Sequence, residues 1–176
     1  VVVGLGGSST SDGGAGVVAG LAGQPFDRSN PLCNGAEALH EVTSWPAIRQ
    51  LELELLVATD VDVPLHGSRG AAHGFAPQKG ANVEMVASIA ANLQHWSNLA
   101  PKSLRDPALE LGAGAAGGCG FALLTVGGKR VAGAELVFES TGCEQAIDKA
   151  DLVITGEGAL DWQTQEGKLI AQVCAK

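Results

Sequence analysis

A loop rich in hydroxyl groups and glycine is the part of this 176-residue sequence whose residue types point most directly to chemistry. It reads Gly6-Gly7-Ser8-Ser9-Thr10-Ser11-Asp12-Gly13-Gly14 and follows the β-branched run 1–5. Successive backbone N–H groups at a strand-to-helix turn bind anions, and hydroxyl groups add further donors. A Ser/Thr-rich turn capped by Asp12 is the simpler alternative, but capping requires fewer hydroxyl groups. We therefore predict a phosphate or carboxylate site formed by Gly6, Gly7, Ser8, Ser9, Thr10, Asp12 and Gly13.

Two carboxylates follow the second candidate strand, residues 52–59. Asp60 and Asp62 are two residues apart, and on an extended segment such side chains face the same side. They could bind Mg²⁺ through water or take a proton from a substrate hydroxyl group. The alternative is a solvated turn in which Asp60 serves as a cap.

A lysine and a polar cluster lie in two further loops. Lys79 stands between Pro77 and Gly80 ahead of a predicted helix, where its ammonium could pair with a phosphate; a plain surface lysine is the alternative. The cluster follows the run 151–155 and places acid, amide and hydroxyl groups after a predicted strand. Its candidate site residues are Glu157, Asp161, Gln163 and Thr164.

The segment 112–120 matches the pattern G-x-G-x-x-G, but the residues before it make a poor strand, so dinucleotide binding is only one interpretation. We expect a glycine-rich loop close to a ligand, with Gly114 and Gly117 as contacts; plain packing is the other alternative. No Gly-Lys pair in the chain is followed by Ser or Thr, so a P-loop is excluded.

The elements that must position these residues alternate between strands and helices. This order predicts an α/β fold with a mainly parallel sheet, in which ligands bind at the carboxyl ends of the strands. The expected strands are 1–5, 52–59, 134–139 and 151–155. The expected helices are 13–21 with Asp12 as cap, 83–99 with Asn82 as cap, 121–124, 143–150 and 167 onward. Residues 24–50 are predicted as loop with one short helix or hairpin, and residues 60–82 as one long loop.

Composition narrows the class of protein. The chain has 11 Lys and Arg against 19 Asp and Glu, a net charge of −8, and no basic run, which argues against nucleic-acid binding. No apolar stretch reaches the roughly 18 residues of a transmembrane helix, and no signal peptide is visible, so we expect a cytoplasmic protein without a membrane partner. The four cysteines contain no C-x-x-C pair and are expected to be reduced, structural thiols.

Taken together, five segments in this order resemble the glycerate kinase family. The resemblance rests on Gly6 to Gly16, on Asp60-Val61-Asp62-Val63-Pro64-Leu65, on Phe75-Ala76-Pro77-Gln78-Lys79-Gly80-Ala81, on Gly112 to Gly118, and on Ile154-Thr155-Gly156-Glu157-Gly158 with Asp161, Gln163, Thr164, Gly167 and Lys168. The sequence departs from the family pattern at Ser9, Ser11, Val63, Ala76 and Ala159, where the family usually has Ala, Asn, Asn, Gly and Arg.

The resemblance implies phosphorylation of D-glycerate by ATP with Mg²⁺, giving 2-phosphoglycerate, in the cleft of a two-domain α/β protein. Under this hypothesis the loop 6–14 binds phosphates or the glycerate carboxylate, and Lys79 offsets charge on the transferred group. Asp60 or Asp62 orients the glycerate hydroxyl group or holds Mg²⁺, and Asp161 is the other candidate for these roles.

The resemblance also implies a longer chain. Motifs of the Asp-Ser-Phe-Lys-Gly and Ala-Asp-Gly-Gly-Glu-Gly types are absent, so residues 1–176 are expected to be a single α/β unit from the centre of such a kinase. The alternatives from other classes are a non-catalytic module that binds a small anion, and an NAD-dependent enzyme that uses the glycine loop at Gly112.

Overall fold

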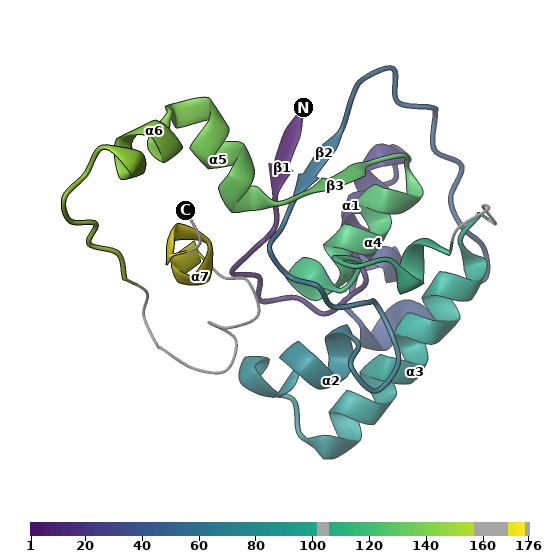
Figure 1. Cartoon of the computed structure of the whole chain (residues 1–176). Helices are drawn as coiled ribbons and strands as arrows, with labels where there is room; N and C mark the ends of the chain where they lie inside the picture. Colours follow the sequence, from purple (N-terminus) through teal and green to yellow (C-terminus); the bar gives the residue numbers. More distant parts are fainter. Residues whose placement is uncertain (102–105, 157–168, 175–176) are drawn as a thin grey trace.

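A small parallel sheet organises the molecule (Figure 1). The computed structural model describes residues 1–101, 106–156 and 169–174. Its strands β1 (Val2–Gly4), β2 (Leu56–Ala58) and β3 (Lys129–Val131) are hydrogen-bonded in the order β1-β2-β3, and both pairs are parallel. The predicted α/β class with a parallel sheet is confirmed. Because all three strands run the same way, the segments that follow them leave from one edge of the sheet.

The sheet differs from the sequence prediction in its third strand. β3 begins with two charged, exposed residues, Lys129 and Arg130, so no apolar or alternating run marks it in the sequence. The segment 134–139, predicted as a strand, belongs to helix α5 (Gly133–Thr141). Ala134 and Phe138 are its buried residues, and their spacing of four is the period of a helix face.

The run 151–155 is also not a strand. Residues 151–156 form no strand in the structure, and Leu152 and Ile154 are 77% and 88% exposed. A strand requires a hydrogen-bonded neighbour, and this run lies apart from the sheet (Figure 1). Its β-branched residues therefore make a strand-like pattern that finds no partner within the described residues.

The helices follow the prediction more closely. Helix α3 (Val83–Leu99) has the predicted bounds, and the Asn82 side chain accepts a hydrogen bond from the Met85 N–H at 2.8 Å, as a helix cap does. The other predicted helices are present as α1 (Ala15–Leu21), α4 (Cys119–Thr125), α6 (Cys143–Asp148) and α7 (Leu169–Cys174).

The long loop predicted for residues 60–82 contains regular structure. Helix α2 (Ala71–Phe75) and the 3₁₀ turn η3 (Pro77–Lys79) lie within it. Each is too short to show a hydrophobic period in the sequence. The remaining short turns are η1 (Pro31–Cys33), η2 (Glu37–Glu41), η4 (Pro107–Leu109) and η5 (Ala115–Gly118).

The core joins the helices to the loop that follows β1. Trp96 of α3 is fully buried and stacks on Trp45 with ring centroids 4.3 Å apart, while Phe121 of α4 meets Trp45 edge-on at 5.8 Å. The Trp96 indole N–H donates a hydrogen bond to the Gly13 carbonyl oxygen at 3.1 Å. The hydrophobic core therefore holds the end of the predicted anion loop in place.

The structure also bears on the cysteines and on membrane-spanning helices. The four cysteines are free thiols, as predicted. Among the residues that the structure describes, no helix combines the length and the apolar character needed to cross a membrane.

Candidate functional site

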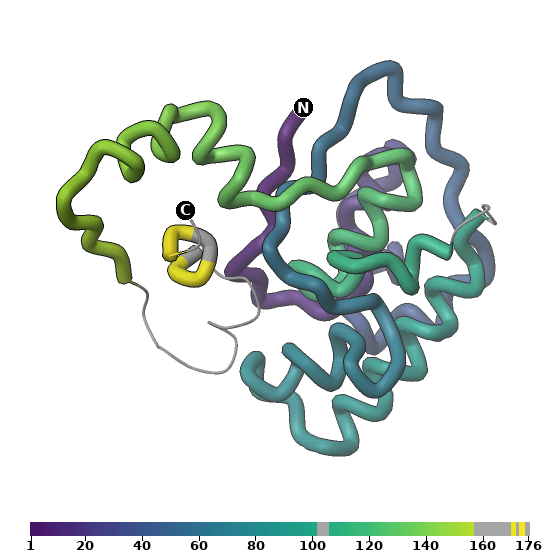
Figure 2. Tube along the Cα trace, in the orientation of Figure 1, coloured from purple at the N-terminus to yellow at the C-terminus, as the bar shows by residue number. Residues whose placement is uncertain are grey.

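The loop between β1 and α1 crosses the carboxyl edge of the sheet. In Figure 2 its purple trace leaves the sheet and turns toward the helical part of the molecule. The Asp12 carboxylate accepts hydrogen bonds from the N–H groups of Gly14 (3.1 Å) and Gly16 (3.5 Å), next to the start of α1 at Ala15. Asp12 therefore stabilises the shape of the loop. The N-cap of α1 is Gly14, without a side-chain cap hydrogen bond, so the prediction of Asp12 as the cap of a helix starting at Gly13 is wrong: the helix begins two residues later.

The second glycine segment packs directly on this loop. The Gly13 N–H donates to the Gly117 carbonyl oxygen at 2.9 Å. A Cβ atom on Gly117 would lie 2.0 Å from the Thr10 carbonyl oxygen, and one on Gly118 would lie 2.4 Å from the Gly13 Cα. The two backbones can approach this closely only because both positions lack a side chain.

The surroundings of segment 112–120 argue against dinucleotide binding as the interpretation of its G-x-G-x-x-G match. A dinucleotide site requires a strand immediately before the first glycine. The described residues 106–111 contain the turn η4 and no strand, so the NAD-dependent alternative loses its structural basis. Gly114 packs against the segment after β2, because its N–H donates to the Val63 carbonyl oxygen at 2.8 Å and a Cβ there would lie 2.4 Å from the Pro64 carbonyl oxygen.

Lys79 extends from η3 to the loop after β1. Its ammonium donates hydrogen bonds to the Ser8 hydroxyl group at 3.0 Å and to the Thr10 carbonyl oxygen at 2.5 Å. Partial burial lowers the pKa of Lys79, while the neighbouring Cys119 and Asp12 oppose that shift. An ammonium has three N–H donors, so with two so engaged it can still donate to a bound anion.

A small cavity of about 130 Å³ lies where four of the quoted motif segments meet. It is lined by Leu5, Gly6, Gly7, Ser8, Val61, Phe75, Gln78, Lys79, Ala116 and Gly117. These residues come from the loops after β1 and β2, from α2 and η3, and from the second glycine segment. The tertiary structure thus brings Gly6, Gly7, Ser8, Lys79 and Gly117 together from distant parts of the chain.

Both predicted acids after β2 contact β3 and α5 and do not line this cavity. The Asp60 carboxylate accepts a hydrogen bond from the Ala134 N–H at 3.4 Å, at the start of α5. Asp62 forms an ion pair with Arg130 of β3, and its side chain is 55% exposed. Across the parts of the chain that the structure describes, no three His, Cys, Asp or Glu side chains gather as a metal cage would require.

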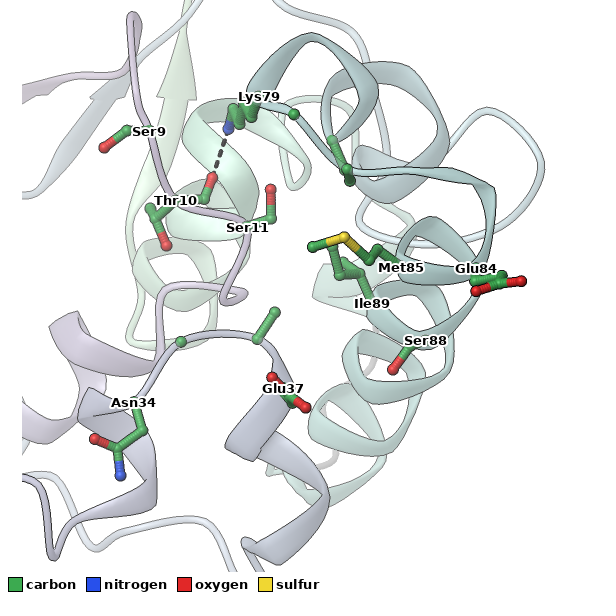
Figure 3. A pocket seen from close by; sticks show the side chains of 15 residues that line it. Ser9, Thr10, Ser11, Asn34, Glu37, Lys79, Glu84, Met85, Ser88 and Ile89 are labelled. Carbon is green, nitrogen blue, oxygen red and sulfur yellow. Dashed lines mark hydrogen bonds between the residues drawn. The ribbon is translucent and has the colours of Figure 1, made fainter.

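Lys79 also lines a larger groove of about 650 Å³ (Figure 3). Ser9, Thr10 and Ser11 line it from the loop after β1. The sequence did not single out its other polar and apolar members, which include Asn34, Glu37, Met85, Ser88 and Ile89. Their spacing carries no chemical signal, because Ile89 belongs to the apolar period of α3 and the others are ordinary exposed types.

The last predicted group, Glu157, Asp161, Gln163 and Thr164, lies outside the described residues. Their placement relative to the cavity therefore stays a prediction.

Comparison with known proteins gives consistent results. The profile of the "Glycerate kinase family" matches residues 1–176. The chain is 41% identical to a glycerate kinase from Bacillus subtilis (strain 168), over 96% of this chain and 46% of the relative. It is 37% identical to a glycerate 2-kinase from Escherichia coli (strain K12), over 100% of this chain and 49% of the relative.

A solved structure gives the same result at the level of the fold. The chain superposes on a crystal structure reported as a glycerate kinase 2 candidate from Salmonella typhimurium LT2, with a TM-score of 0.73 and 35% identity. The match covers 99% of this chain and 48% of that structure. The chain therefore spans about half the length of the relatives that it matches.

Proposed function

The chain belongs to the glycerate kinase family, and we propose that the protein containing it transfers a phosphoryl group from ATP to D-glycerate, giving 2-phosphoglycerate. The relatives named as glycerate kinases support the proposal, and this chain matches about half of their length. The observation that carries it is the position of Lys79, whose ammonium is hydrogen-bonded to the loop after β1 and lines the cavity where the motif segments meet.

The cavity has the size and chemistry for a small acid. Its volume of about 130 Å³ admits a three-carbon acid but not a nucleotide. Gly6, Gly7 and the Ser8 hydroxyl group line it, and backbone N–H and hydroxyl groups of this kind bind carboxylate or phosphate oxygens.

Phosphoryl transfer depends mainly on alignment and on neutralising charge. In the proposed mechanism Lys79 neutralises negative charge on the transferred phosphoryl group, since its ammonium borders both the small cavity and the large groove. The backbone of the loop 6–14, held by Asp12 and Trp96, keeps the acceptor in line with the donor.

Mg²⁺ accompanies the nucleotide in this proposal. Magnesium that binds with a nucleotide requires one or two protein carboxylates, with the remaining oxygens from phosphate and water. Asp60 and Asp62 provide such a set at the carboxyl end of β2, and the half-exposed ion pair of Asp62 with Arg130 is weak enough to be exchanged. These residues would hold the ion, which neutralises phosphate charge when bound. Asp161 is the alternative ligand or base.

The function is tested by coupled ADP release from the full-length protein with D-glycerate and Mg-ATP. Phosphorus NMR of the product distinguishes 2-phosphoglycerate from 3-phosphoglycerate. Glycerate-dependent ADP release with 2-phosphoglycerate as product supports the proposal. Binding of glycerate without turnover would instead indicate the anion-binding module.

Lys79→Met tests the observation on which the proposal depends. Removing one group that stabilises transition-state charge lowers kcat by about a hundredfold or more. Since burial lowers the pKa of Lys79, the protonated side chain is disfavoured in the folded protein, and its removal should leave folding intact. Lys129→Met is the matched control, because Lys129 is exposed and pairs with Glu54 at 3.4 Å on the amino side of the sheet. Equal activity of the two variants would contradict the role of Lys79.

A further inference from the structure

The groove of about 650 Å³, which shares Lys79 with the small cavity, has not yet been assigned a ligand. One wall is the face of α3 that carries Met85 and Ile89, and the opposite wall is the loop with Thr10 and Ser11. In Figure 3 the side chains of Met85 and Ile89 project from the helix toward Ser11.

The chemistry changes along the length of this groove. The Lys79 ammonium lies at one end, Met85 and Ile89 form an apolar middle, and the Glu37 carboxylate lies toward the other end (Figure 3). A fitting ligand therefore has an anionic end, a flat or apolar middle and hydrogen-bond donors at its far end. A nucleotide with an amino-substituted base has these features in this order: its phosphates are the anionic end, its ribose links them to a flat base, and the amino group of the base is the donor at the far end.

We propose that this groove binds the nucleoside part of the phosphoryl donor, with its phosphate chain ending at Lys79. The base lies against Met85 and Ile89, and the Glu37 carboxylate accepts a hydrogen bond from the amino group of the base. The inference deepens the proposed function and rests on it for the identity of the donor as ATP.

The two hollows differ enough in size to assign their ligands. Drug-sized ligands occupy pockets of roughly 300 to 1,000 Å³, a range that includes the groove. The cavity of about 130 Å³ is too small for a nucleoside. Placing glycerate in the groove would leave the apolar wall of Met85 and Ile89 without a function, because a small hydroxy acid has no apolar surface to bury there. Lys79 lines both hollows, so the phosphoryl group would pass from one ligand to the other beside its ammonium.

Met85→Trp in the full-length protein tests this assignment. Met85 is 51% exposed, so the larger ring can be accommodated at the surface while it fills the groove. Val83→Trp is the matched control, because Val83 is 86% exposed on the same helix and does not line the groove. Calorimetry should show affinity for the non-hydrolysable analogue AMP-PNP weakened about tenfold in Met85→Trp and unchanged in Val83→Trp. The KM for glycerate should stay within about twofold of the unmodified protein in both.

Glu37→Leu provides a second test that does not depend on bulk. Loss of a charged hydrogen-bond acceptor should weaken binding of AMP-PNP and of adenosine about fivefold or more. Glu41→Leu is the control, since Glu41 is exposed on the same turn η2 and does not line the groove. Unchanged AMP-PNP affinity in both Met85→Trp and Glu37→Leu would overturn the assignment, as would a raised KM for glycerate alone.

Failure of this inference and failure of the proposed function give different results. Turnover of glycerate with unaltered AMP-PNP affinity in Met85→Trp leaves the kinase proposal intact and refutes the groove. If AMP-PNP binding is weakened in that variant but the unmodified protein does not turn over glycerate, the groove is supported as the nucleotide site and D-glycerate is refuted as the phosphoryl acceptor. Absence of AMP-PNP binding by the unmodified protein refutes the groove assignment.

Discussion

At the scale of single residues, the position of Lys79 matters more than its type. A lysine ammonium is a point charge on a flexible chain, and water normally surrounds it. Here it donates to the Ser8 hydroxyl group and the Thr10 carbonyl oxygen, so its direction is set by the loop after β1. Burial lowers its pKa, which makes the charged form sensitive to alkaline pH.

We expect an alkaline limit to activity below the ordinary lysine pKa of 10.5. As pH rises through the lowered pKa, Lys79 loses the proton that neutralises the phosphoryl group, and kcat/KM falls. The stability effect has the opposite sign: protonated Lys79 is disfavoured in the folded state, so this penalty disappears as pH rises from the lowered pKa toward 10.5. The measurement is kcat/KM of the full-length enzyme from neutral to strongly alkaline pH, together with urea unfolding.

Two variants check that the limit belongs to this residue. Lys79→Arg should move the falling limb to higher pH, because a guanidinium group remains protonated. Cys119→Ser should not move the limb to higher pH, because Cys119 opposes the lowering of the Lys79 pKa and its removal can only lower that pKa further. A limb that is unmoved in Lys79→Arg would assign the titration to another group.

At the scale of elements, the site depends on contact between two glycine-rich segments. The segment 112–118 supports the loop after β1 through backbone atoms, with the Gly13 N–H donating to the Gly117 carbonyl oxygen. The backbones of Gly118 and Gly13 are also in close contact, because a Cβ atom on Gly118 would lie 2.4 Å from the Gly13 Cα. The glycine residues of segment 112–118 therefore allow close packing of the two backbones, and this packing fixes the conformation of the loop after β1.

Gly117→Ala and Gly127→Ala separate this packing from backbone strain. Both positions have positive φ, 68° and 96°, so alanine is strained at each by about 1 kcal/mol. Only at Gly117 does the new Cβ meet an atom, the Thr10 carbonyl oxygen at 2.0 Å; nothing lies within 4 Å at Gly127. Overpacking should raise the loss for Gly117→Ala to roughly 3 kcal/mol of unfolding free energy. Urea denaturation measures both, and equal losses would contradict the packing argument.

At the scale of the whole molecule, the hydrophobic core and the site share one residue. Trp96 is fully buried among the helices and also donates to the Gly13 carbonyl oxygen. It stacks on Trp45, which in turn meets Phe121 of α4. The folding of the helical part and the position of the anion loop are therefore coupled.

Trp96→Phe should show this coupling as a loss of stability. The smaller ring leaves the buried Gly13 carbonyl oxygen without its donor, which costs about 1–3 kcal/mol in addition to the lost packing. Trp45→Phe is the control, since it changes the same stack without removing that hydrogen bond. The unfolding free energy from urea denaturation should fall more for Trp96→Phe; the reverse order would place the main role of Trp96 in the stack.

Some features of this protein follow from its sequence alone. The bounds of α3 and its Asn82 cap were predictable, because helix periodicity and capping depend on residues within a few positions of one another. The family also follows from the sequence, since five segments in a fixed order are specific together where each is weak alone.

Tertiary structure decided the rest. β3 begins with two charged residues and α2 has only five residues, so neither shows an apolar period in the sequence. The strand-like run 151–155 forms no strand in the described structure, because pairing depends on a neighbouring strand and not on local pattern. The hydrogen bond between Lys79 and Ser8 joins residues 71 positions apart, and the groove combines the loop after β1 with α3. Such contacts form only when the chain folds and distant segments pack together. Residue types and spacing therefore predicted Lys79 and the glycine loops as site residues, and the tertiary structure determined which residues they contact.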